Sequence, residues 1–141
     1  MMKLAICKLR DSAKTPSYAH DGDACFDLFA AKHMVLPAKS AAIVPTGLAF
    51  AVPDGYALDI HGLSGMALWL SVAAWYGTVD AGFGGEVLVL LHNYGVNNIT
   101  IKVGDRVAQA RLTPSPRVTF EVTEQLDMTE RGIGGFGSSG V

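Results

Sequence analysis

Apolar residues along this chain fall in short runs that are interrupted by turn residues. The runs are rich in β-branched and aromatic side chains, and short runs of this kind favour strands over helices. Prolines and glycines separate them, as in Pro45-Thr46-Gly47 and Pro53-Asp54-Gly55, because these residues preset the dihedral angles of turns. We therefore predict strands at residues 3–9, 25–30, 34–36, 41–44, 48–52, 56–61, 87–91, 99–103, 106–112 and 118–122.

This density of short strands predicts an all-β fold, either a barrel or a double sheet. Residues 64–70 are the one helical candidate, with room for one or two turns. The run at 87–91 is apolar throughout, which predicts a buried strand.

The character of the chain changes after Thr123. Residues 131–141 are rich in glycine and serine, a composition typical of a flexible linker. Arg131 and Phe136 are unusual in an inert linker and suit a strap that orders over a ligand, with the cation on an anion and the ring on another ring. We therefore predict a β-barrel domain at residues 1–122 and a flexible strap at residues 123–141.

Composition narrows the setting in which the protein works. With 141 residues, of which 50% are hydrophobic and 17% charged, we expect one domain whose surplus apolar surface forms a subunit interface. No apolar run approaches the ~18 residues of a membrane span. The formal net charge of −2 argues against a nucleic-acid partner. The apolar stretch before Lys8 is too short for a signal-peptide core, so we expect a cytoplasmic protein.

The chain is organised around residues 77–95, where Asp80 precedes the glycines Gly82, Gly84 and Gly85. Glycine allows a backbone to approach a ligand closely, so Asp80 is a candidate for chemistry on that ligand. The same residue could equally close a hairpin turn.

Five segments, in order, resemble the five motifs of the trimeric dUTP pyrophosphatases (dUTPases). They are DACFDL at 23–28, LSGMA at 63–67, GTVDAGFGGE at 77–86, GDRVAQ at 104–109 and RGIGGFGSSG at 131–140. The resemblance implies a jelly-roll-like distorted barrel that assembles as a homotrimer, with sites between subunits and the strap closing over a neighbour's site. It also implies that dUTP is hydrolysed to dUMP and pyrophosphate, with Mg²⁺ bound to the triphosphate.

The resemblance assigns roles to individual residues. Asp80 would activate the water that attacks the α-phosphate, because a carboxylate can accept its proton. Asp27 would hold a metal-bound water, although a turn or cap acid is an equally good interpretation. Gly77 would bind the uracil edge, Phe83 would pack under the deoxyribose and Phe136 would stack on the uracil.

A second group of residues would bind the phosphates, and it comprises Ser64, Gly65, Gln109, Arg131, Ser138 and Ser139. Ser64 and Gly65 would open a short helical turn with free N–H groups, or would form an ordinary helix cap. Gln109 would donate to a phosphate or would simply be solvated. Asp105 and Arg106 could be a surface turn pair, and we predict no direct contact for them.

The chain departs from the family pattern at two arginines. Leu63 stands at the arginine of the second motif and Gly84 at that of the third, while Phe83 replaces a tyrosine. One lost charge-assisted contact costs about 1.5–3 kcal/mol. His61 would share a strand face with Leu63 and could partly compensate. We therefore predict slower or weaker turnover, with inactivity as the alternative.

Two other functions compete with dUTP hydrolysis. A dCTP deaminase has the same fold and a similar Asp-x-Gly-aromatic turn, but its catalytic glutamate would fall at Leu90, which cannot transfer protons. A non-catalytic nucleotide-sensing or partner-binding protein is favoured by Leu63 and opposed by Asp80 and the strap.

Overall fold

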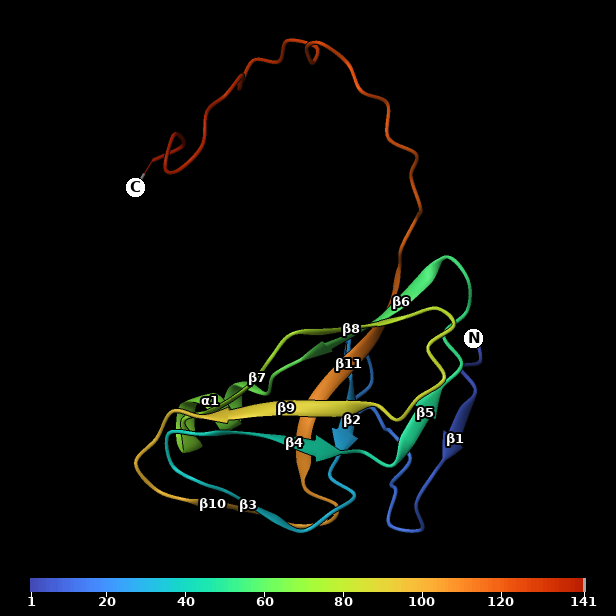
Figure 1. Ribbon diagram of the computed structural model, residues 1–141, viewed down its shortest axis with the longest axis vertical. Coiled ribbons are helices and arrows are strands. Elements are labelled where there is room, and N and C mark those ends of the chain that lie inside the picture. Colours follow the sequence, from blue (N-terminus) through green and yellow to red (C-terminus); the bar gives the residue numbers. More distant parts are fainter. Residues whose placement is uncertain (141) are drawn as a thin grey trace.

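A computed structural model describes residues 1–140, which form a β-rich body with a single short helix and a long C-terminal tail (Figure 1). The elements in chain order are β1 (Ile6–Lys8), β2 (Phe26–Phe29), β3 (Met34–Leu36), β4 (Ala41–Pro45), β5 (Leu48–Phe50), β6 (Tyr56–His61), α1 (Ser64–Leu70), β7 (Val72–Ala74), β8 (Gly77–Asp80), β9 (Leu88–Asn93), β10 (Ile99–Ile101) and β11 (Arg106–Pro114). No helix among these residues is long and apolar enough to cross a membrane.

The strands form small antiparallel sheets that enclose one core. The four-stranded sheet has the order β2-β11-β6-β8 and the three-stranded sheet has the order β4-β9-β7. Two further pairs, β1-β5 and β10-β3, complete the body. Leu28, Leu58, Leu91 and Val107 are fully buried between the sheets, so side chains rather than a channel fill the interior.

Strand β9 is only half buried, which corrects the prediction for residues 87–91. Val89 and Leu91 face the core, whereas Leu88 is 48% exposed and Leu90 is 37% exposed. Ile43, opposite Leu90 on β4, is 56% exposed. The outer face of this sheet is therefore apolar and is not covered by its own chain.

The predicted strand at 118–122 is wrong. No strand is present there, and Val118, Phe120 and Val122 are largely exposed because no other strand of the chain pairs with this segment. Two strands were not predicted, β7 and β8, because alanine in the first and glycine in the second give a weak strand preference. The helix at Ser64–Leu70 and the strands at Met34–Leu36 and Tyr56–His61 have the predicted bounds.

The tail leaves the body after β11 and extends away from it as a long arc (Figure 1). Its hydrogen bonds are mostly local, such as those from the N–H of Gly134 to the carbonyl of Arg131 and from the N–H of Ser138 to the carbonyl of Gly135. The division of the chain at residue 122 stays a prediction.

Candidate active site

The four-stranded sheet brings two of the predicted residues side by side. Asp27 on β2 lies directly opposite Gln109 on β11, and Gln109 lies opposite His61 on β6. Residues directly opposite in an antiparallel pair project from the same face of the sheet. The carboxylate of Asp27 and the amide of Gln109 therefore belong to one surface.

Asp27 is buried and ion-paired, not a turn or cap acid. It lies within β2, is 6% exposed, and its Oδ2 is 3.0 Å from Nε of Arg106. A buried carboxylate needs such a partner, because an unpaired charge in the interior is costly. Of the predicted surface turn pair, only Asp105 fits, since its Oδ2 accepts a hydrogen bond from the N–H of Lys102 at 2.8 Å.

A hollow of about 370 Å³ lies beside this pair at the start of α1, and its lining residues are Leu63, Ser64, Gly65, Met66, Arg106 and Gln109. Leu63, not Ser64, occupies the N-cap position, with an extended backbone and no side-chain capping bond, so the ordinary-cap interpretation of Ser64 is wrong. The first N–H groups of a helix have no partner within it, so Ser64 and Gly65 present donors to the hollow.

Gln109 has a structural bond in addition to its predicted role. Its Nε2 donates to the carbonyl oxygen of Gly62 at 2.9 Å, which holds the segment that enters α1 against β11. An amide nitrogen carries two hydrogens, so one donor is left for a ligand. Gln109 is half-buried, which excludes the simply solvated interpretation.

The glycine hairpin forms a second, separate hollow. It has a volume of about 280 Å³ and is lined in part by Ile60, Gly77, Asp80 and Phe83. Asp80 ends β8, and its carbonyl accepts a hydrogen bond from the N–H of Phe83 at 3.1 Å. The backbone closes the turn, so the exposed carboxylate of Asp80 keeps no hydrogen-bond or ion-pair partner within residues 1–140.

The turn after Asp80 depends on one glycine and on one ion pair. Gly82 has φ +87°, a left-handed backbone conformation that residues other than glycine rarely adopt. Glu86, at the other end of the turn, accepts from Nε of Arg10 at 2.8 Å and from Nη2 at 3.3 Å. This ion pair raises the pKa of Arg10, chiefly through the hydrogen bond to Glu86.

The two hollows of one chain are well separated. Gln109 lies opposite His61, whereas Asp80 lies opposite Ala57, four residues earlier on the same strand β6. At the rise of a β-strand this offset corresponds to ~13 Å along the sheet. The two sets of lining residues share no member. A water held by Asp80 and a phosphate group held by Gln109 of the same chain are therefore out of reach of each other.

His61 does not replace the arginine missing at Leu63. Its ring packs edge to face against Tyr76, with ring centroids 5.2 Å apart, and its Nε2 is buried without a hydrogen-bond partner. His61 is absent from the lining of the hollow, whereas Leu63 is part of it. Arg106 is the charged residue that the sequence did not single out for this hollow.

The strap residues lie outside both hollows. Nε of Arg131 donates to the carbonyl of Gly134 at 2.8 Å, and Phe136 is fully exposed. Ser138 and Ser139 are also exposed, in the tail that extends away from the body (Figure 1). Their assignment to phosphate and uracil binding stays a prediction.

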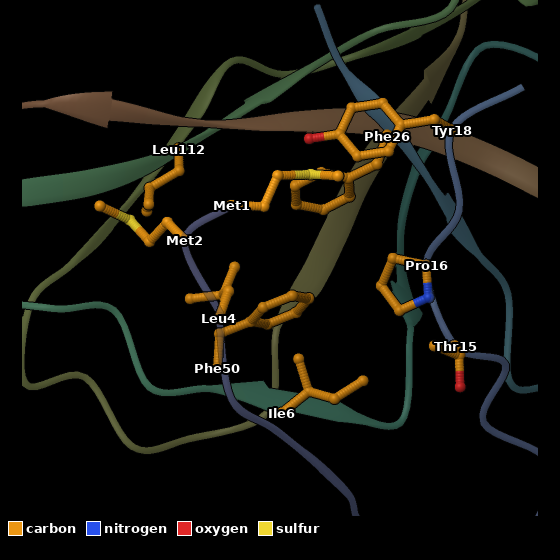
Figure 2. A pocket seen from close by; sticks show the side chains of 10 residues that line it. All are labelled: Met1, Met2, Leu4, Ile6, Thr15, Pro16, Tyr18, Phe26, Phe50 and Leu112. Atoms are coloured by element: carbon orange, nitrogen blue, oxygen red, sulfur yellow. The ribbon is translucent and has the colours of Figure 1, made fainter. Parts of the chain in front are cut away.

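One further cavity, of about 450 Å³, lies beneath the N-terminus (Figure 2). It is lined mainly by apolar side chains, among them Met1, Leu4, Ile6, Phe26 and Phe50. None of the predicted site residues lines it. It therefore lacks the acid and the anion-binding donors that the two hollows hold.

The fold and the site define an all-β protein that presents a free carboxylate on a glycine hairpin and a donor-lined hollow elsewhere on the same sheet. The family model described as dUTPase matches residues 11–140. The deoxyuridine 5'-triphosphate nucleotidohydrolase of Wolinella succinogenes is 40% identical over 141 residues, covering 99% of this chain and 95% of that protein. The chain belongs to the dUTPase family.

Solved dUTPase structures share the fold. A mutant dUTPase of Staphylococcus bacteriophage 80alpha with dUpNHpp aligns with a TM-score of 0.95 and 25% identity, covering 100% of both chains. A mutant dUTPase from phage phi11 of S. aureus, described as revealing the coordination of a structural Mg(II) ion, aligns with a TM-score of 0.86 and 22% identity. It covers 90% of this chain and 100% of that chain. The predicted family and the all-β jelly-roll fold are confirmed.

Proposed function

We propose that this chain hydrolyses dUTP to dUMP and pyrophosphate. The observation that carries the proposal is the carboxylate of Asp80, exposed at the end of β8 beside Gly77 and Phe83 and without a partner within residues 1–140. A carboxylate used only for structure would be bonded within the hairpin, whereas this one is free to hold a water. The relative from Wolinella succinogenes, which aligns with 99% of this chain, is named as a nucleotidohydrolase of deoxyuridine 5'-triphosphate, and this name supports the same reaction.

In the proposed reaction Asp80 orients a water and accepts its proton as the water attacks the α-phosphate. The new bond joins the water oxygen to the α-phosphorus, and the bond to the bridging oxygen breaks, which releases pyrophosphate. A base positioned in this way contributes about 10²–10⁴ in rate. Gly77 and Phe83 would place the nucleoside in the same hollow, so the α-phosphate would lie next to the carboxylate of Asp80.

Binding of the phosphates is assigned to the hollow at the start of α1. Ser64 and Gly65 would donate from the backbone, and Gln109 would donate its remaining amide hydrogen. Arg131, Ser138 and Ser139 would join when the strap closes, which requires the tail to leave the arc seen in Figure 1. Phe136 would then cover the uracil.

The residues present fit a magnesium ion that the substrate brings with it. No cluster of three or more His, Cys, Asp or Glu side chains occurs in the described part of the chain, so the protein offers no cage of its own. Mg²⁺ is commonly held by one or two carboxylates together with substrate phosphates. Asp27, buried beside the phosphate hollow, is such a carboxylate and would hold the ion through water. When bound, the ion would neutralise phosphate charge.

We also propose that the active sites form between subunits of a homotrimer. Within one chain Asp80 and Gln109 are ~13 Å apart along the sheet, so a complete site needs the hairpin of one subunit and the phosphate hollow of another. The outward apolar residues Ile43, Leu88 and Leu90 supply surface for the contact. We propose dUTP as the substrate of these sites, and we propose no nucleic-acid or membrane partner.

A nucleotide-sensing protein without catalysis is the second candidate. It is favoured by Leu63, which puts an apolar side chain in the phosphate hollow where the family pattern has an arginine. The deaminase alternative receives no support, because Leu90 projects outward from β9 with no acid to replace it on that strand.

The deciding experiment measures pyrophosphate release from dUTP with Mg²⁺, beside dCTP, dTTP and UTP, for the wild type and Asp80→Asn. We expect release from dUTP alone and a loss of about 10²–10⁴ in kcat in the variant, with binding of a non-hydrolysable dUTP analogue preserved. Binding of dUTP by the wild type without any release would instead establish the sensor.

A further inference from the structure

Arg10 ties the turn at residues 81–86 to an anchored part of the body. Its Nε and Nη2 donate to the two carboxylate oxygens of Glu86 at 2.8 and 3.3 Å. The loop that carries Arg10 is itself held, because the N–H of Leu9 donates to the carbonyl of Gly47 at 2.7 Å. A bidentate pair of this kind fixes the direction of the carboxylate as well as its place.

The turn makes few other bonds. Within the described part of the chain its backbone hydrogen bond is the local one from the N–H of Phe83 to the carbonyl of Asp80. Hollows lie on both sides of the turn. One, of about 280 Å³, contains Asp80, and the other, of about 680 Å³, is lined by Gly82, Phe83 and Gly84 together with residues of β1 and β5. The turn therefore has space to move, and its ion pair at Glu86 restrains it.

The ring of Phe83 lies against the residue that precedes Glu86. An ideal Cβ built at Gly85 would lie 2.8 Å from Cζ of Phe83 and 3.3 Å from its Cε2, so the ring occupies the space of the missing side chain. Phe83 is 48% exposed and also lines the hollow that contains Asp80. The position of the ring thus follows the backbone at Gly85, which Arg10 fixes one residue further on.

We propose that Arg10 determines sugar specificity, because by holding Glu86 it keeps the ring of Phe83 close beneath the deoxyribose and so excludes a 2′-hydroxyl. The inference rests on the proposed function, which places the sugar against Phe83. Arg10 does not line the hollow and acts through Glu86, so it is a positioning residue. It brings a cation from the N-terminal loop to a turn in which the family pattern has an arginine at Gly84.

The size of the expected effect follows from the chemistry of the ring. An apolar wall rejects an added hydroxyl by about a hundred-fold, because it offers no hydrogen bond and leaves no room for the oxygen. Rejection of this kind depends on close contact. It is lost when the turn moves toward the larger hollow and carries the ring with it.

The test compares the affinities of two non-hydrolysable analogues, one of dUTP and one of UTP, measured by titration calorimetry with Mg²⁺. The two carry the same base and triphosphate, so the ratio of their affinities isolates the sugar. The variants are Arg10→Gln, Glu86→Gln, the two combined, and the charge exchange of Arg10→Glu with Glu86→Arg. Lys8→Gln is the matched control, because Lys8 is exposed beside Arg10 and its amine has no ion-pair partner within residues 1–140.

We expect the wild type to prefer the deoxy analogue by about ten- to hundred-fold, and Arg10→Gln to lower this preference to less than about three-fold. Glu86→Gln and the double variant should lower it no further, since all of them break the same pair. The charge exchange should return the preference to within about three-fold of the wild type. Lys8→Gln should leave it unchanged.

Three results overturn the inference. The first is a lowered melting temperature of Arg10→Gln with the sugar preference intact, which is the behaviour of a purely structural ion pair. The second is a wild type that binds both analogues equally. The third is a double variant that regains the wild-type preference, because the unpaired charge of Glu86 and not the position of the turn would then control binding.

Arg10→Lys keeps the test decisive if Arg10→Gln does not fold. Lysine retains the charge but lacks the planar fork that binds both carboxylate oxygens. The sugar preference should therefore fall by at least about three-fold, and a wild-type preference in this variant would refute the role of the bidentate pair.

The outcome is separable from that of the proposed function. A sugar preference that depends on Arg10, without dUTP hydrolysis, supports this inference while the catalytic proposal fails. Hydrolysis of dUTP with a sugar preference indifferent to Arg10 does the reverse, and a wild type that binds neither analogue overturns both.

Discussion

Two carboxylates of this chain occupy opposite environments, and the difference matches their proposed roles. Asp80 is exposed and has no partner within residues 1–140, so it can take up a water and its proton. Asp27 is buried and ion-paired with Arg106, whose Nε lies 3.0 Å from its Oδ2. Asp80 lines the hairpin hollow, whereas Asp27 lies beside the phosphate hollow, so the two proposed roles belong to separate places in the fold.

Gly82 gives a first prediction at this scale. Gly82→Ala should lower the free energy of unfolding by about 1–2 kcal/mol, because φ +87° is strained for any side chain while the surrounding space is open. The strain falls on the turn that carries Asp80 and Phe83, so kcat should fall as well. Urea unfolding and steady-state kinetics measure both effects.

Gly84→Ala is the control for this prediction. Gly84 lies in the same turn, also has open space around its Cα, and has no left-handed φ. A loss of stability in Gly84→Ala as large as that in Gly82→Ala would contradict the argument from backbone conformation.

The sequence predicted single site residues where they belong to a recognisable motif. It did not predict them where strand register decides which face of the sheet a side chain lies on. Asp80, Ser64 and Gln109 stand in recognisable segments, and each lies in one of the two hollows. Arg106 was missed because its direction depends on a bulge that period-2 alternation does not reveal. His61 was a wrong candidate because its ring finds Tyr76 instead.

At the scale of elements, β9 is anchored by one buried amide at its end. Asn93 is fully buried, and its Nδ2 donates to the carbonyls of Leu36 and Asn97 while its Oδ1 accepts from the N–H of Gly95. These bonds tie the end of β9 to β3 and to the loop that leads to β10. The side-chain amide of Asn93 therefore links two sheets that are not joined by strand pairing.

Asn93→Ala should lower the free energy of unfolding by about 3 kcal/mol, because buried backbone groups lose their partners and each unsatisfied group costs ~1–3 kcal/mol. Chemical denaturation measures the change. Asn98→Ala should cost less than about 1 kcal/mol, since Asn98 is exposed and its Oδ1 accepts only from the N–H of Ala38. Equal losses in the two variants would refute the role of Asn93.

The elements that the sequence predicted are those whose pattern is local. The turn chemistry around 45–47 and 53–55 bounds β5 and β6, and both strands formed where expected. The segment 118–122 has a strand pattern of equal quality but no partner strand in its own chain, so pattern alone could not decide it. Strand β7 forms because β9 offers an edge to pair with, which its sequence does not show.

At the scale of the whole molecule, the separation of the two hollows makes a prediction about mixed assemblies. Asp80→Asn and Gln109→Ala should each be inactive or nearly so as pure proteins. Unfolded, mixed in equal amounts and refolded together, they should recover about a quarter of wild-type dUTP hydrolysis, because some sites pair an intact hairpin with an intact phosphate hollow. Pyrophosphate release measures the recovery.

The control for mixing is a chain that carries both substitutions. Refolded with the wild type, it lowers activity, and refolded with Asp80→Asn it should restore none. Failure of the two single variants to complement each other, with light scattering showing a mass three times the 14.9 kDa of the chain, would place both hollows of each site in one subunit.

The distance between the hairpin and the phosphate hollow has a consequence for inheritance and dosage. In the proposed trimer each chain contributes its hairpin to one active site and its phosphate hollow to another. A copy damaged in both hollows therefore inactivates two of the three sites. A cell that makes intact and doubly damaged copies together would lose more activity than the damaged fraction alone accounts for. Such a defect would act dominantly, although the damaged chain does nothing by itself.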